Sequence, residues 1–307
     1  MEIGIVGLGK MGGNMAHRLH DRAHSVIGYD TNPAQAHGVE SSLTSTATSL
    51  EELVAKLSPP RIVWLMVPAG EPTDSAIDEL SAHLSPGDIV IDGGNSHYTD
   101  SVRRANALSL KGIRFLDIGV SGGVWGFDEG YCLMAGGDPD AYAHVEPILH
   151  DLAPEGGYAR VGDSGAGHFV KMVHNGIEYG MLEAYGEGIE LLHASKYQFD
   201  LHQLATLWMH GSVVRSWLLE LAADAFQNDP NLTSIEGYVE DTGEGRWSVD
   251  EALHSAVPVP AMADAVFARF RSREKESFSA KVIAALRHEF GGHKVVKETP
   301  DKSEKAA

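Results

Sequence analysis

A chain of 307 residues with 43% hydrophobic and 22% charged side chains has the composition of an ordinary globular protein and is long enough for two domains. Its formal net charge of -19 argues against nucleic-acid binding, which needs a basic surface. The single Cys132 excludes an intramolecular disulfide and fits a reducing compartment. No apolar run approaches the roughly 20 residues of a membrane span, and the N-terminus lacks a signal-peptide pattern. We therefore expect a soluble, cytoplasmic protein.

The first residues carry a dinucleotide-binding pattern. Residues 2–6 read as a short buried strand, and a Gly-x-Gly-x-x-Gly segment follows them before a helix. Gly7 permits the tight turn, Gly9 lets a pyrophosphate approach the backbone, and Gly12 lets helix and strand pack closely. The free amides of the helix N-terminus can then bind the phosphates. The candidate cofactor residues in this segment are Gly7, Leu8, Gly9, Lys10, Met11 and Gly12.

A second strand, residues 25–29, is followed by Asp30. A carboxylate at this point accepts hydrogen bonds from both adenosine ribose hydroxyls and repels a 2′-phosphate. The next residues, Thr31 and Asn32, offer no arginine for that phosphate. The sequence therefore predicts NAD as the cofactor, with NADP secondary. A glycine turn beside a surface aspartate is the alternative.

Further strands are expected at residues 61–67, 88–91 and 113–116. Ligands bind at the carboxyl ends of strands in such sheets. Asn95 follows the second of these strands, and Ser121-Gly122-Gly123 follows the third, so we expect both loops to line a substrate cleft. As isolated segments they would be plain loops. Met66, Val67 and Asn95 complete the candidate cofactor residues.

The second half of the chain is expected to be helical. Helices are expected over residues 168–193, 203–226, 249–254, 262–271 and 279–288, with a flexible joint at 162–167 and a loop at 228–247. The fold class is thus an α/β Rossmann-type dinucleotide-binding domain followed by an all-α C-terminal domain. The expected bounds are 1–163 for the first domain, 164–293 for the helical domain and 294–307 for a disordered tail.

A polar stripe runs along the long expected helix. Lys171, His174, Asn175 and Glu178 fall at i, i+3, i+4 and i+7, which is one face of a helix. A stripe with this spacing is normally apolar because it faces the core. The stripe therefore predicts a buried site with a base and an acid on one rigid element. The alternative is a solvated face with a Lys–Glu pair.

Three cations late in the chain are candidates for binding an anionic substrate. Arg246 follows a glycine-rich segment, and a guanidinium can bind a phosphate with two parallel hydrogen bonds. A surface arginine in a turn is the alternative. Arg287 and His293 lie near the end of the chain. The sixteen histidines show no metal-ligand spacing, so we expect no catalytic metal.

With these motifs assembled, the chain resembles 6-phosphogluconate dehydrogenases in their short-chain form, from Gly4 to His293. The resemblance rests on Ile-Asp-Gly-Gly-Asn-Ser at 91–96, Gly-Val-Ser-Gly-Gly at 119–123 and Lys-Met-Val-His-Asn-Gly-Ile-Glu-Tyr at 171–179. It implies oxidative decarboxylation of 6-phosphogluconate to ribulose 5-phosphate and CO₂ with reduction of NAD, a step of the pentose phosphate pathway.

The resemblance also implies a role for each candidate residue. Lys171 would be the general base that takes the 3-hydroxyl proton, and Glu178 would protonate C1 of the enediol. The substrate carboxylate and hydroxyls would be held by Asn95, Ser121, Gly122, Gly123, His174 and Asn175. The phosphate would be held by Tyr179 and Arg246, with Arg287 and His293 reaching in from a partner subunit.

The chain departs from the long members of that family. Asp30 stands where NADP-using members carry Asn-Arg-Thr after the second strand, which favours NAD. A second helical segment that supplies a further phosphate-binding arginine in long members is missing. Arg215 has a locally similar motif but comes too early in the chain to be given that role. The shorter helical region must change subunit packing, so a homodimer and a homotetramer are both open.

Two other functions compete with this interpretation. A β-hydroxyacid dehydrogenase acting on a small acid such as 3-hydroxyisobutyrate would share the glycine loop, the Ser-Gly-Gly loop and the helical lysine, but would need no phosphate site. A nucleotide-sensing scaffold would bind NAD without chemistry. The pair Lys171 and Glu178 argues against the scaffold, because a binding module needs no acid–base pair.

Overall fold

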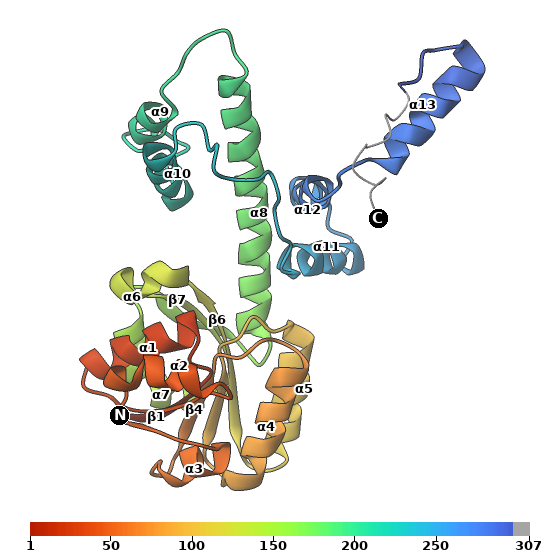
Figure 1. The fold of residues 1–307 in the computed structure, drawn as a ribbon. Coiled ribbons are helices and arrows are strands. Elements are labelled where there is room, and N and C mark those ends of the chain that lie inside the picture. Colours follow the sequence, from red (N-terminus) through yellow and green to blue (C-terminus); the bar gives the residue numbers. More distant parts are fainter. Residues whose placement is uncertain (297–307) are drawn as a thin grey trace, which may run out of the picture. The chain divides into compact units, whose positions relative to one another are not determined.

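The computed structural model describes residues 1–296 (Figure 1). The chain forms two compact units, one comprising Met1–Met181 and Gly243–Met262, the other Leu182–Thr242 and the residues from Ala263 onward. The long helix α8 (Ala166–His193) begins in the first unit and ends in the second. The domain boundary expected after residue 163 stays a prediction, and the part of the expected tail beyond residue 296 lies outside the described residues.

The first unit is built on an eight-stranded sheet with the order β3-β2-β1-β4-β5-β6-β7-β8. The strands are β1 (Glu2–Val6), β2 (Ser25–Tyr29), β3 (Ser45–Thr46), β4 (Ile62–Leu65), β5 (Ile89–Asp92), β6 (Arg114–Ser121), β7 (Cys132–Gly137) and β8 (Tyr158–Gly162). Strands β1 to β6 are parallel, β7 is antiparallel to β6, and β8 is parallel to β7. The predicted Rossmann-type fold class is confirmed.

Helices cover both faces of this sheet (Figure 1). One face packs on α1 (Lys10–Asp21) and α7 (Pro139–Leu152), and the other on α3 (Leu50–Ala55), α4 (Glu71–His83) and α5 (Tyr98–Ser109). All four residues of β4 are buried, as expected for a strand covered on both sides. Shorter helical segments of this unit are α2 (Pro33–Gly38), η1 (Glu40–Ser42), η2 (Gly123–Trp125), α6 (Gly126–Glu129) and α11 (Glu244–His254).

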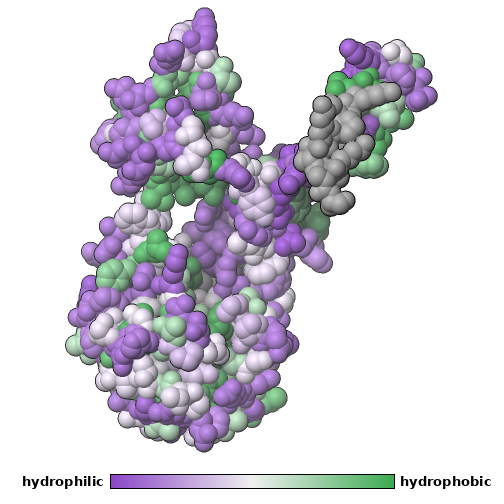
Figure 2. Space-filling view, viewed as in Figure 1, coloured by the Kyte–Doolittle hydropathy of each residue, from purple (hydrophilic) through white to green (hydrophobic). Residues whose placement is uncertain are grey.

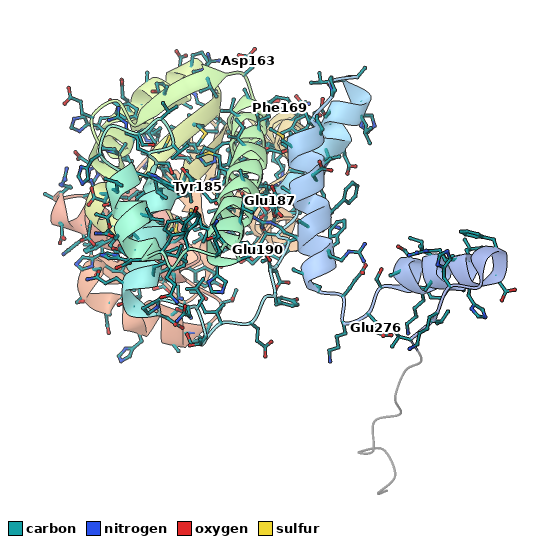
Figure 3. All side chains as sticks on the ribbon, turned by 90° about the horizontal axis from the view of Figure 1, so that it is seen from above. Asp163, Phe169, Tyr185, Glu187, Glu190 and Glu276 are labelled. Carbon is teal, nitrogen blue, oxygen red and sulfur yellow. The ribbon has the colours of Figure 1, made fainter. Side chains whose placement is uncertain are left out.

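The described part of the second unit consists of helices and their connections. Its elements are the second half of α8, α9 (Leu201–Trp208), α10 (Trp217–Asn228), most of α12 (Pro260–Ser272) and α13 (Phe278–Gly291). Ala205, Leu219 and Ala223 form a small core against which Tyr185 of α8 packs. Figure 3 shows Tyr185 with Glu187 and Glu190 on this half of α8. No helix in the described residues is long and apolar enough to span a membrane.

Three sequence-based expectations about these elements are wrong in their bounds. The single helix expected over 203–226 is broken, because Gly211 has φ +78 and Ser216 caps the start of α10 by accepting from Leu219 N. The loop expected over 228–247 ends earlier, since α11 begins at Glu244. The strand expected to end at residue 116 continues to Ser121 as β6.

Candidate active site

The glycine loop between β1 and α1 has the shape that a dinucleotide requires. Gly7 has φ +92, and a Cβ built on Gly12 would lie 1.9 Å from the carbonyl oxygen of Gly7. Both positions are therefore restricted to glycine. A Cβ on Gly9 would meet no atom within 4 Å, so the backbone there is open to a ligand. The closed packing at Gly7 and Gly12 and the open backbone at Gly9 fit a bound pyrophosphate.

Asp30 is held beside this loop by backbone amides. Its Oδ2 accepts from Leu8 N at 2.7 Å, and its Oδ1 accepts from Asn32 N at 2.7 Å. A carboxylate oxygen has room for two hydrogen bonds, so each oxygen can still accept from a ribose hydroxyl. Met66 and Val67, the other candidate cofactor residues, follow β4 and are half-buried.

The loop that carries Asn95 is shaped by a buried ionic network. Asp92 is fully buried, and its Oδ2 accepts from Ser96 Oγ at 2.8 Å and from Arg104 Nη1 at 2.9 Å. Arg104, only 2% exposed, also donates to Asp74 Oδ1 at 2.7 Å. Asn95 itself is exposed. Sequence reasoning named Asn95 as a candidate but missed the residues that support its loop. The available signal was an arginine on the inward face of α5, three residues after the buried Ser101.

Strand β6 places three functional positions on one side of the sheet, because alternate residues share a face. Asp117 is the first, and it caps the start of α8: Oδ1 accepts from Gly165 N at 2.7 Å and Oδ2 from His168 N at 3.0 Å. Burial raises the pKa of the Asp117 carboxyl, and the nearby His168 opposes this rise. Asp117 thus binds the segment 162–167 that was expected to be a flexible joint, and Gly167 within it is buried; its flexibility stays a prediction.

Gly119, the second position, packs directly against Lys171 of α8. A Cβ built on Gly119 would lie 2.4 Å from Lys171 Cβ, so a glycine here allows α8 to lie directly on the strand. Lys171 is 9% exposed. Burial lowers the pKa of its amine, while Glu178 and Glu244 act in the opposite direction. A buried amine with a lowered pKa is suited to serve as a general base.

Ser121, the third position, meets the polar stripe of α8. Its Oγ lies 3.4 Å from His174 Nε2, and His174 Nδ1 lies 3.0 Å from Asn175 Oδ1. The stripe is buried or half-buried, whereas Val170 and Ile177 on its flanks are 37% and 50% exposed. The polar side of this part of α8 thus faces inward.

The Ser-Gly-Gly loop after β6 is tied to the dinucleotide-binding helix. Gly122 has φ +132 and Gly123 has φ +54, conformations that favour glycine. Beyond them, Val124 O accepts from Asn14 Nδ2 of α1 at 3.3 Å. Arg18 Nη1 of α1 donates to Phe127 O at 2.8 Å. Hydrogen bonds therefore join the helix that follows the glycine loop to the segment that follows the Ser-Gly-Gly loop.

Helix α11 completes the surroundings of the α8 stripe. A Cβ on Gly245 would lie 2.4 Å from the ring of Tyr179, which is buried, so the first turn of α11 packs against it. Glu244 is 3% exposed and accepts from Asn175 Nδ2 at 3.3 Å. Arg246, in the same turn, is exposed. Sequence reasoning missed Glu244 as a site residue, because its contact lies on a distant helix.

Not every candidate residue belongs to this unit. Arg287 lies on α13 and His293 follows that helix, both in the second unit and both exposed. Arg215 lies in the connection between α9 and α10, also in the second unit. The roles assigned to Arg287 and His293 stay predictions. The described residues hold no group of three or more His, Cys, Asp or Glu side chains arranged for a metal ion.

Comparison with known proteins agrees with this geometry. Residues 2–162 match the family described as the NAD binding domain of 6-phosphogluconate dehydrogenase, and residues 167–306 match the 6-phosphogluconate dehydrogenase C-terminal domain. The chain is 46% identical to YqeC of Bacillus subtilis over 97% of its length and 100% of that protein. It is 42% identical to the NAD(+)-dependent, decarboxylating 6-phosphogluconate dehydrogenase of Haloferax volcanii, over 97% of this chain and 99% of the relative.

A solved structure shows the same architecture in a longer protein. The 6-phosphogluconate dehydrogenase of Plasmodium falciparum superposes with a TM-score of 0.81 at 29% identity, covering 98% of this chain and 67% of that one. The two halves of the sequence thus match two domains of the same family, and the glycine loop and the α8 stripe agree with that match. The chain belongs to the 6-phosphogluconate dehydrogenase family.

Proposed function

We propose that this protein oxidises and decarboxylates 6-phosphogluconate to ribulose 5-phosphate and CO₂, with NAD as the preferred electron acceptor. The observation that carries the proposal is the buried Lys171 amine with its lowered pKa, on the same helix as Glu178 and packed against Gly119 of β6. The Haloferax volcanii relative, which is 42% identical to this chain over nearly the full length of both, is named for this reaction, and this favours it over oxidation of a small hydroxyacid.

The chemistry follows from what each side chain can do. The glycine loop from Gly7 to Gly12 would hold NAD, which would supply the acceptor for the hydride of substrate C3. Neutral Lys171 takes the proton of the 3-hydroxyl, and as an ammonium it then polarises the new 3-keto group while CO₂ leaves. Glu178 donates a proton to C1 of the enediol. The two groups lie on one face of α8, two turns apart, so one can act at C3 and the other at C1 of the same substrate.

Substrate binding is assigned to the loops around these two groups. Asn95, Ser121, Gly122, Gly123, His174 and Asn175 hold the carboxylate and hydroxyls. Tyr179 and Arg246 hold the phosphate. The proximity of Ser121, His174 and Asn175 supports the first assignment. The packing of Tyr179 against Gly245, next to Arg246, supports the second.

The test is a steady-state assay with 6-phosphogluconate and 3-hydroxyisobutyrate, each with NAD and with NADP. We expect turnover of 6-phosphogluconate with release of CO₂, and a higher kcat/KM with NAD. Lys171→Ala should abolish turnover and leave the affinity for NAD unchanged. Absence of turnover on 6-phosphogluconate would refute the function, and cofactor reduction by Lys171→Ala would refute the base.

We further propose that the active form is a homodimer or homotetramer in which α13 binds a second copy. Phe278, Val282, Ile283, Leu286 and Phe290 of α13 are between 41% and 79% exposed. Their spacing places them on one side of the helix. Figure 2 shows hydrophobic side chains at the surface of this helix. An apolar stripe of this kind is typical of a protein interface, and Arg287 and His293 would be carried with it to the partner's site.

Mixed oligomers test this arrangement. Lys171→Ala and Arg287→Ala should each be inactive alone. If each site combines Lys171 of one subunit with Arg287 of another, random mixing restores about a quarter of wild-type activity, because half of the dimers are mixed and each has one intact site. No recovery after confirmed subunit exchange would place Arg287 outside the partner's site. Native mass spectrometry gives the subunit number.

We also propose a cytoplasmic location for the protein, because Cys132 is a free cysteine and free cysteines are typical of a reducing compartment.

A further inference from the structure

We propose that Glu244 is a positioning residue: through Asn175 it determines which ring nitrogen of His174 carries the proton. The inference deepens the proposed function and rests on it for its catalytic meaning. It gives a task to a buried carboxylate that the reaction itself does not use.

Glu244 is firmly placed at the start of α11. It is 3% exposed and is the first residue of that helix, where a negative charge is favoured by the helix dipole. Ser248 Oγ lies 3.0 Å from Glu244 O and 2.9 Å from Met172 O, so it links the first turn of α11 to α8. The Glu244 side chain reaches α8, where its Oε1 accepts from Asn175 Nδ2.

The hydrogen bonds that join Glu244, Asn175 and His174 have only one consistent direction. A carboxylate can only accept, so Asn175 must present its amide nitrogen to Glu244 Oε1, 3.3 Å away. The carbonyl oxygen of Asn175 then faces His174 Nδ1 at 3.0 Å. A carbonyl oxygen also only accepts, so Nδ1 must carry the proton. In a neutral imidazole Nε2 is then an acceptor.

This acceptor points at the substrate side of the site. His174 Nε2 lies 3.4 Å from Ser121 Oγ, the hydroxyl at the end of β6. It can accept from Ser121 or from a substrate hydroxyl, but it cannot donate. With the opposite tautomer the ring would present a donor there, and a bound sugar hydroxyl could no longer donate to it. Glu244 therefore selects how His174 receives the substrate.

A glutamine at this position would remove the selection. Its side chain has nearly the shape of glutamate but offers both a donor and an acceptor, so Asn175 can turn its amide over. Both tautomers of His174 then become available. Only molecules with the Nδ1–H tautomer then accept the substrate hydroxyl, so kcat/KM on 6-phosphogluconate should fall in proportion to the fraction that has lost this tautomer, about twofold for an even mixture.

The decisive measurement is the tautomer of His174 without substrate. Protein with ¹⁵N-labelled histidine is compared by NMR with His174→Asn, which identifies the His174 signals. We expect the Nδ1–H form in the wild type and a mixture in Glu244→Gln. The matched control is Glu251→Gln, on the same helix, whose carboxylate bonds to Tyr98 at 2.7 Å instead. It should leave the His174 tautomer unchanged.

The possible outcomes separate the two proposals. An unchanged Nδ1–H tautomer in folded Glu244→Gln overturns the inference. If Glu244→Gln does not fold, Glu244→Asp takes its place, since its shorter side chain withdraws the carboxylate from Asn175; an unchanged tautomer there also overturns the inference. Because the spectra are recorded without substrate, failure to turn over 6-phosphogluconate would refute the proposed function and leave the tautomer result standing.

Discussion

Lys171 can occupy its place on the sheet only because residue 119 has no side chain. A Cβ on Gly119 would lie 2.4 Å from Lys171 Cβ, closer than two such atoms can approach. The amine is thus placed by a strand residue far away in the sequence, and not by its own helix alone.

Gly119→Ala should therefore disable the site. The added methyl group must displace the first turns of α8, and a small misplacement of a catalytic base can cost about a hundredfold in rate. We expect kcat to fall by about that factor while the affinity for NAD is retained. Gly188→Ala on the same helix is the control, because its Cβ would meet nothing within 4 Å. Equal kcat values in the two variants would contradict this account.

The rate of the reaction should reveal the lowered pKa of Lys171. Burial moves this pKa below its usual 10.5, so the amine becomes a working base at lower pH than an exposed lysine would. We expect kcat/KM to rise with pH along an acid limb whose midpoint lies below 10.5. An acid limb whose midpoint lies at or above 10.5 would contradict a base with a lowered pKa.

The same burial should appear in the stability of the folded chain. A folded-state pKa below 10.5 means that the unfolded chain binds more protons between the two values, so the free energy of unfolding rises with pH there. Below both pKa values the lysine is charged in the folded and the unfolded chain, and burying that charge lowers the free energy of unfolding by its full amount. Lys171→Met should therefore stabilise the protein at neutral pH, and this gain should shrink as pH approaches 10.5. Urea unfolding at several pH values measures it, and a gain independent of pH would speak against a buried ammonium.

Asp30 should control the choice between NAD and NADP. Its carboxylate is fixed by Leu8 N and Asn32 N at the edge of the glycine loop, where it would repel a 2′-phosphate. Asp30→Ala should lower kcat/KM for NAD and narrow the ratio between the two cofactors. Steady-state assays with both cofactors provide the check; an unchanged ratio would show that other groups set the preference.

Arg104 should support both stability and the Asn95 loop. Arg104→Met leaves the fully buried Asp92 without its cation, which should cost about 3–5 kcal/mol in the free energy of unfolding. Arg103→Met is the matched control, since Arg103 pairs with Asp74 at an exposed position and should cost about 1 kcal/mol or less. Similar losses in the two variants, measured by urea unfolding, would contradict the proposed difference between them.

The parts of the fold that the sequence predicts are those with a local signal. The glycine loop, its flanking strands and the long α8 each show their pattern within a few residues. The length of β6 does not, because Asp117 and Gly119 are poor strand formers. They are accommodated because their partners Gly165 and Lys171 come from a distant segment. The break between α9 and α10 had a local signal in Gly211 that the periodic pattern outweighed.

The residues of the candidate site also divide into those that a local pattern predicts and those that it does not. The stripe from Lys171 to Glu178 follows from helical spacing alone. Glu244 and Arg104 could not be found that way, because what gives each its importance is a buried partner on another element. Sequence spacing gives the residues that share an element, whereas the supports of a site come from tertiary packing.

Strand β6 also restricts how this enzyme can change during evolution. From one face of a single strand, Asp117 caps the start of α8, Gly119 makes room for Lys171, and Ser121 begins the proposed substrate loop. A one-residue insertion or deletion within β6 would turn every following side chain to the opposite face. All downstream positions would be lost at once, and no single later substitution could restore them. Variation in length should therefore be excluded from this strand and confined to the loops at its ends.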